Sequence, residues 1–206
     1  MKGNRIITIG RQIGSGGSEI GMEVAKRLGI QCYDRQLIEM ACDYGELDQD
    51  ILAEAEEKRP NPFLYSVPRQ MQNDKTGRGI AINDMVFNLQ SEVIRRLAEK
   101  ESCVIIGRCA DYVLRDRKDC VNVCIHSDLT SRIKRATEQY GLSPVKAGDE
   151  INKIDKQRAT YYRYYSEKKW GRAENYDLSV YSDSIGLEAC TDLILSFVDK
   201  KLGHNA

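Results

Sequence analysis

Short apolar runs alternate with longer stretches of helical periodicity along this chain. We predict strands at five runs rich in β-branched residues: 6–9, 30–33, 103–106, 121–125 and 178–181. Between them, apolar residues recur every three or four positions, which predicts helices over about 18–28, 84–100, 144–165 and 187–202. This alternation predicts an α/β fold, with a doubly wound five-stranded parallel sheet and helices on both faces.

The segment 58–78 departs from this rhythm. It contains Pro60, Pro62 and Pro68 among polar residues. Such a long, turn-rich connection is uncommon in a compact domain, so we expect it to be either functional or mobile. The 206 residues suffice for one well-buried core and fall short of two full-sized domains, so residues 1–206 are predicted to form a single domain.

Composition excludes several classes of partner. The chain has 31 basic and 31 acidic residues, so its formal net charge is zero, and its overall charge gives no reason to expect nucleic acid or an anionic membrane surface as a partner. No apolar run approaches the roughly 18 residues that a membrane span needs. We therefore expect a cytoplasmic protein with no nucleic-acid or membrane partner. The oligomeric state stays open, with a homodimer as one option.

The seven cysteines are scattered and odd in number. None of them forms the C-x-x-C spacing of a metal site or a redox motif. Several fall inside the predicted strands, where a free cysteine behaves as a small apolar residue. We expect buried, reduced thiols.

A glycine-rich loop carries the strongest chemical indication. Gly14, Ser15, Gly16, Gly17 and Ser18 follow the first predicted strand directly and open the first helix. Glycines let a backbone curl around an anion, and the N-terminus of a helix carries partial positive charge. This arrangement predicts a phosphate-binding loop.

The loop departs from the standard P-loop, G-x-x-x-x-G-K-[ST]. If Ser18 stands for the final Ser or Thr, which holds Mg²⁺, then Gly17 occupies the place of the lysine. That lysine normally stabilises the charge of the terminal phosphates. Two interpretations are open: Arg11 supplies the missing charge, or the loop binds phosphate with weakened catalysis.

A dinucleotide-binding loop is an alternative. The pattern G-x-G-x-x-G starting at Gly14 meets Glu19 where the third glycine belongs. Asp34, about 20 residues further on, does fit the acid that binds a ribose. The match is partial, and a nicotinamide or flavin enzyme stays an alternative on this pattern.

Four motifs together resemble one family. They are the glycine-rich loop, Tyr33-Asp34-Arg35, Gly107-Arg108 after an apolar strand, and the Asp155 to Arg163 stretch of a tyrosine-rich helix. In combination, and over essentially the whole chain, they resemble the cytidylate kinase-like family. The resemblance implies a P-loop kinase fold with a helical acceptor insert over about 36–82 and a lid over about 140–176. It also implies Mg²⁺-dependent transfer of the γ-phosphoryl group of ATP to a small acceptor, with a nucleoside monophosphate such as CMP as the first candidate.

The resemblance also implies roles for single residues. The loop from Gly14 to Ser18 would hold the donor's phosphates, with Ser18 on Mg²⁺, and Asp34, Arg35 and Arg108 would contact the acceptor. Catalytic roles fall to Arg11, Arg108, Asp155, Arg158 and Arg163, with Arg132 as an assistant. The tyrosines of the same helix are expected to form a half-buried packing face.

The arginines suit this chemistry. Phosphoryl transfer needs cations around a spreading negative charge, and the guanidinium fork binds phosphate with two hydrogen bonds. A phosphate acceptor needs no general base, whereas an alcohol acceptor would need one, for which Asp34 is the candidate. A nucleotide-sensing module with little kinase activity is the rival hypothesis. Gly17 favours that rival, and the charged residues of the lid argue against it.

Overall fold

The computed structural model describes residues 4–34 and 78–203, apart from the side chains of residues 78–83 and 85. All five predicted strands are present. They are β1 (Ile6–Arg11), β2 (Gln31–Tyr33), β3 (Cys103–Ile106), β4 (Cys120–His126) and β5 (Leu178–Tyr181). They form one parallel sheet in the order β2-β3-β1-β4-β5, which confirms the predicted five-stranded parallel sheet.

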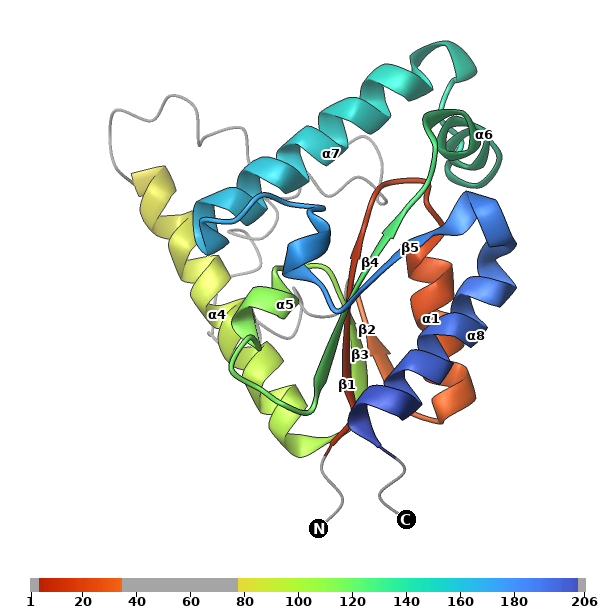
Figure 1. The fold of residues 1–206 in the computed structure, drawn as a ribbon. Helices are drawn as coiled ribbons and strands as arrows, with labels where there is room; N and C mark the ends of the chain where they lie inside the picture. The colour runs from red at the N-terminus through yellow and green to blue at the C-terminus, as the bar shows by residue number, and fades with distance from the viewer. Residues whose placement is uncertain (1–3, 35–77, 204–206) are drawn as a thin grey trace.

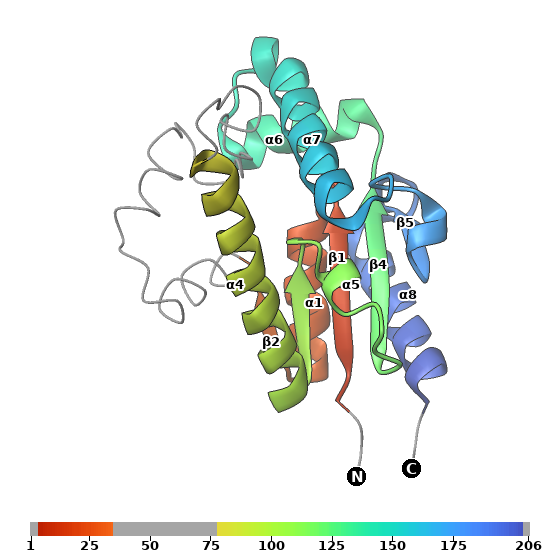
Figure 2. The same ribbon diagram turned by 90° about the vertical axis from the view of Figure 1, so that its left-hand side faces the viewer.

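Helices cover both faces of this sheet. The helices are α1 (Gly17–Leu28), α4 (Arg78–Lys100), α5 (Ala110–Val113), α6 (Leu129–Tyr140), α7 (Pro144–Ser166) and α8 (Ser182–Leu202), with a short 3₁₀ helix, η2 (Ala173–Asn175). Figure 1 shows α1 and α8 on one face and α4 and α5 on the other. After a quarter turn, Figure 2 shows α6 and α7 lying beyond the carboxyl ends of the strands, where open α/β sheets bind ligands.

Several described helices differ from the sequence prediction: α4 begins at Arg78, ahead of the predicted 84, the short α5 was not predicted, and α6 and α8 differ as well. Helix α6 was not predicted; its start is capped by Asp128, whose carboxylate accepts a hydrogen bond from Ser131 N at 2.9 Å, and Gly141 ends it in a left-handed conformation. Helix α8 begins at Ser182, ahead of the predicted 187, because one extra turn precedes a non-helical residue, Gly186 (φ 79°, ψ 167°).

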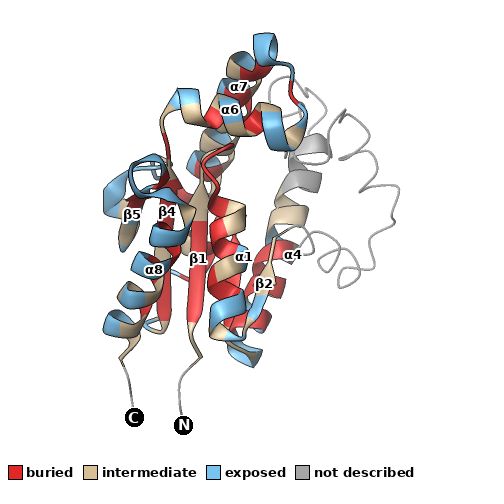
Figure 3. Cartoon of the chain, turned by 90° about the vertical axis from the view of Figure 1, so that its right-hand side faces the viewer, coloured by how far each residue is buried: buried red, intermediate tan, exposed pale blue. Residues whose placement is uncertain are grey.

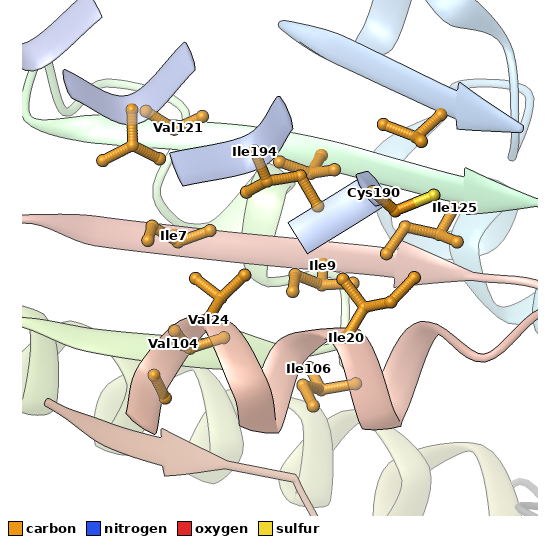
Figure 4. Close-up of a cluster of buried hydrophobic side chains, with 14 residues drawn as sticks. Ile7, Ile9, Ile20, Val24, Val104, Ile106, Val121, Ile125, Cys190 and Ile194 are labelled. Atoms are coloured by element: carbon orange, nitrogen blue, oxygen red, sulfur yellow. The ribbon is translucent and has the colours of Figure 1, made fainter. Parts of the chain in front are cut away.

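The core has two layers, one on each face of the sheet. Between the sheet and the helices α1 and α8, Ile7 and Ile9 of β1 pack against Ile20 and Ile194, as Figure 4 shows. The opposite layer contains Ile6, Val93, Ile94, Leu97, Ala98, Cys103, Ile105, Ala110, Val113, Leu114 and Cys120. Successive residues of a strand point to opposite faces, so the continuous apolar runs fill both layers. Each fully buried isoleucine contributes about 1.5–3 kcal/mol.

A third cluster joins the phosphate loop to the helices above it. Ile13 of the loop is buried among Ala136, Leu142, Ala147, Ile151 and Ile154. Figure 3 shows this burial continuing from the central strands into the inner side of α7. Helix α7, which makes up most of the predicted lid, and helix α6, which precedes it, are therefore packed on the loop by an apolar contact.

Six of the cysteines lie in the described residues. All six are free thiols, and five of them are buried, with Cys32 half-buried. The prediction of buried, reduced thiols is confirmed for five of them, and Cys32 is reduced but only partly buried. Cys42 lies outside the described residues, as does most of the predicted insert 36–82 and of the segment 58–78. Among the described helices, none has the length and apolar character to cross a membrane.

Candidate phosphate-binding site

The loop between β1 and α1 requires glycine at two positions. Gly14 (φ 75°) and Gly16 (φ 78°) both have left-handed backbones. A Cβ atom at Gly14 would lie 2.6 Å from the carbonyl oxygen of Arg132, and one at Gly16 would overlap the side chain of Leu187. Their lack of side chains lets the loop close tightly over the start of α1, whose first N–H groups have no partner within the helix.

Hydrogen bonds hold the loop from beneath. Gln12 N donates to Ile125 O at 3.1 Å, and the hydroxyl of Ser182 donates to Ser15 O at 2.7 Å. The hydroxyl of Ser15 is buried and donates to Gln12 O at 2.9 Å. The predicted phosphate contact of Ser15 is therefore restricted to its backbone, because its side chain points into the protein.

Arg11 fills the space beside Gly17, the position of the usual P-loop lysine. A Cβ at Gly17 would lie 2.5 Å from Arg11 Cβ and 3.0 Å from its Cγ, and a Cβ at Gly107 would overlap the Arg11 guanidinium. The Arg11 side chain thus runs between two glycines, one on the phosphate loop and one after β3. This geometry favours the first sequence interpretation, in which Arg11 brings a cation to the loop.

Asp34, at the end of β2, faces the phosphate loop. One carboxylate oxygen pairs with the Arg11 guanidinium at 3.2 Å, and the other accepts a hydrogen bond from the Ser18 hydroxyl at 3.3 Å. The predicted metal residue Ser18 and the predicted acceptor residue Asp34 are therefore in direct contact. A hydroxyl and a carboxylate side by side are the oxygen ligands that Mg²⁺ prefers.

The turn after β3 presents Arg108. Gly107, Arg108 and Cys109 have successive positive φ angles of 75°, 56° and 53°. Left-handed backbone is unfavourable for residues other than glycine and persists only where the surrounding structure holds it. Such held turns concentrate at functional sites, in keeping with the predicted contact of Arg108 with a phosphate.

Asp155 of α7 clamps the loop. Its carboxylate accepts a hydrogen bond from Ile13 N at 3.1 Å and forms an ion pair with Arg132, whose Nε donates to Ile13 O at 2.8 Å. Burial raises the pKa of Asp155, and the positive charge of Arg132 opposes that shift. Asp155 and Arg132 therefore hold the loop backbone, and the catalytic role of Asp155 and the assisting role of Arg132 stay predictions.

Arg158 reaches the same loop from α7. Its guanidinium donates to Arg11 O at 2.9 Å, and its side chain is only 12% exposed. Burial lowers the pKa of Arg158 to about 9, and the positive charges of Arg11 and Arg108 lower it further, against the opposing carboxylates of Asp155 and Asp34. Arg11, Arg108 and Arg158 therefore form a cationic cluster whose mutual repulsion an anionic ligand would relieve.

Other predicted residues fall elsewhere. Arg163 is exposed on α7, and in the described part of the chain no contact joins it to the loop. Arg35 lies outside the described residues. Tyr140, at the end of α6, was not among the predicted site residues. It lines the pocket over the loop with Arg11, Gln12, Ile13, Gly14, Gly16, Gly17, Ser18 and Arg158.

Comparisons with known proteins identify relatives of this site. The model of the cytidylate kinase-like family matches residues 6–184. A comparison with curated proteins finds no match. The match includes the loop, Asp34, Arg108 and the loop-facing part of α7, and it argues against the dinucleotide alternative for Asp34.

Solved structures show the same fold. An uncharacterized protein from Eubacterium ventriosum is similar with a TM-score of 0.70 and 27% identity, over 95% of this chain and 99% of that chain. A gluconokinase from Sinorhizobium meliloti has a TM-score of 0.56 and 15% identity, over 97% of this chain and 93% of its own. A shikimate kinase from Acinetobacter baumannii, in complex with shikimate, has a TM-score of 0.52 and 13% identity, over 97% of this chain and 95% of its own. The chain therefore has the fold of P-loop kinases.

Proposed function

The chain belongs to the cytidylate kinase-like family, and we propose that it is a Mg²⁺-dependent kinase that transfers the γ-phosphoryl group of ATP to a small acceptor. The observation that carries the proposal is the position of Arg11, whose Cβ and Cγ lie beside Gly17 and whose guanidinium lies at Gly107 and pairs with Asp34. Family and fold support a nucleotide-binding kinase. CMP is the first acceptor to test.

The phosphate loop and its neighbours bind the donor. The N–H groups at the start of α1 and the left-handed glycines face the pocket that would take the phosphates. Arg11 and Arg158 add two fixed positive charges, and Asp155 keeps the loop backbone in place. Since these groups are already oriented, they stabilise developing charge with little reorganisation.

Ser18 and Asp34 would hold the magnesium ion. Their side-chain oxygens lie 3.3 Å apart, close to the roughly 3.0 Å between neighbouring ligands of an octahedral ion with bonds of about 2.1 Å. Mg²⁺ bound here would neutralise charge on the donor's phosphates and orient them. Arg11 forms an ion pair with the same Asp34.

Phosphoryl transfer requires little covalent chemistry from the protein itself. An acceptor oxygen bonds to the γ-phosphorus while the bond to the bridging oxygen breaks, releasing ADP. Arg108 would bind the acceptor's phosphate and keep it in line, and α7 would exclude water from the loop. A phosphate acceptor is already deprotonated near neutral pH, so no general base is required.

The test is Mg²⁺-dependent ADP formation against a panel of acceptors. The panel contains CMP, UMP, other nucleoside monophosphates and alcohols such as shikimate and gluconate, because two structural neighbours carry the names shikimate kinase and gluconokinase. Transfer to CMP that is lost in Ser18→Ala, and kept in Ser196→Ala on the exposed side of α8, would support the proposal. Nucleotide binding that is indifferent to Mg²⁺, with no transfer to any acceptor, would instead favour the sensing module.

A further inference from the structure

One stripe of α7 touches three separate parts of the site. Asp155 and Arg158 bond to the phosphate loop, Tyr162 bonds to α5, and Tyr165 contacts α4. Residues spaced by three and four positions share one face of a helix. A single rigid helix therefore connects the donor loop with both elements beside Arg108.

The contact with α5 is short and well enclosed. The Tyr162 hydroxyl donates to Asp111 Oδ2 at 2.7 Å, and Tyr162 is 4% exposed. Asp111 stands in the helix that follows directly on the left-handed turn of Gly107, Arg108 and Cys109. The hydrogen bond therefore fixes the far end of the turn that aims Arg108.

The contact with α4 supports the same arrangement. The Tyr165 hydroxyl donates to Asp84 Oδ1 at 3.2 Å, and its ring stacks on Phe87 with centroids 3.8 Å apart and planes at 7°. Tyr161 meets the same Phe87 ring edge-on at 6.2 Å. Movement of α7 relative to the loop would thus disturb α4 and α5 together.

We infer that Tyr162 and Asp111 are positioning residues, which couple the seating of α7 on the donor's phosphates to the placement of Arg108 for the acceptor. This inference rests on the proposed function. When a donor fills the pocket, Arg158 gains an anionic partner and α7 is held against the loop. Through Tyr162, that gain in order extends to Asp111 and the strained turn, so the acceptor meets an Arg108 that is already oriented.

The experiment is hydrogen exchange of the full chain with and without AMP-PNP and Mg²⁺. In the wild type we expect slower exchange in residues 10–18 and also in residues 107–114. Tyr162→Phe removes one oxygen atom; it should keep the slowing at 10–18 and lose it at 107–114. The slowing of exchange at 107–114 that AMP-PNP causes in the wild type, and that this variant should lose, should be within the roughly 5- to 150-fold range of coupling between sites. Tyr164→Phe, the same change at a 48% exposed tyrosine of the same helix, should behave as the wild type.

Other outcomes would overturn the inference. Equal slowing at 107–114 in Tyr162→Phe would mean that the hydrogen bond carries no coupling. Slowing at 10–18 alone in the wild type would mean that no coupling exists. No response at 10–18 in the wild type would refute nucleotide binding, and the proposed function and this inference would fall together. Where an acceptor is found, Tyr162→Phe should raise the KM of the acceptor and, because coupling is reciprocal, remove any effect of the acceptor on ATP affinity, while ATP affinity without acceptor stays as in the wild type. A general loss of stability would not produce this split.

Discussion

Adding one methyl group at Gly17 is the sharpest test of the Arg11 placement. Gly17 is the first residue of α1, and its backbone has none of the positive φ angles found at Gly14 and Gly16, so alanine is conformationally acceptable there. The new Cβ would nevertheless lie 2.5 Å from Arg11 Cβ. Relieving such an overlap in a packed site costs about 1–3 kcal/mol. For a chain of this size, that cost corresponds to a fall in Tm of roughly 2–12 °C.

The partner substitutions make this prediction specific. Arg11→Ala retains the clashing Cβ, so Gly17→Ala should cost as much in that background as in the wild type. Arg11→Gly removes that atom, so Gly17→Ala should cost little relative to Arg11→Gly alone. Gly148→Ala is the matched control, because in α7 its Cβ would meet only Ile133 Cδ1, at an ordinary 3.5 Å. Helix propensity should then stabilise the protein by about 0.5–1 kcal/mol.

Urea denaturation followed by circular dichroism measures all four effects. If Gly17→Ala were as stable as the wild type, or if Arg11→Ala rescued it as well as Arg11→Gly, Arg11 would not occupy the place of the lysine. The reasoning behind the donor site would then be wrong.

Three further predictions concern the arginine cluster and its support. Arg158 keeps a charged guanidinium at the loop, where it donates to Arg11 O, so Arg158→Gln should weaken the affinity for Mg·AMP-PNP in calorimetry; an unchanged affinity would remove Arg158 from the donor site. Asp155→Ala removes the carboxylate that pairs with Arg132, which is only 6% exposed. The free energy of unfolding should therefore fall by about 3–5 kcal/mol. A loss under about 1 kcal/mol in urea denaturation would refute this prediction. Arg108→Ala should reduce kcat by roughly 10²–10³. The exposed Arg163→Ala should change stability by less than about 0.5 kcal/mol and leave turnover unaltered. An Arg108→Ala variant that turns over as fast as Arg163→Ala would remove Arg108 from the site.

Local sequence patterns were sufficient to predict the strands of the sheet and the glycine-rich loop. Strands buried on both faces must be apolar along their length, so 103–106 and 121–125 could be recognised without tertiary information. The run from Gly14 to Ser18 could be recognised in the same way, because a tight turn that leads into a helix N-terminus favours glycine wherever φ is positive. Helix α6 escaped detection since its polar surface hides the apolar repeat, although Asp128 and Gly141 are ordinary caps.

The roles of charged residues depended on tertiary packing. Arg158 and Arg163 belong to one helix and one motif, yet only the face seated on Ile13 turns Arg158 to the loop and leaves Arg163 in solvent. The sequence places Asp155 in the predicted lid. Its contact with the loop backbone, and its ion pair with Arg132 of α6, became visible only in the folded structure.

The sequence by itself therefore determined the α/β architecture and the position of the glycine-rich loop that is predicted to bind phosphate. Both follow from short-range rules of periodicity and backbone conformation, which each segment obeys independently. Only the tertiary structure decided that Arg11 lies beside Gly17 and that Asp34 meets Ser18. Those contacts join β1, β2, the turn after β3 and α1. Because these segments are far apart in the sequence, their charged side chains come close only when the folded sheet brings the carboxyl ends of its strands together.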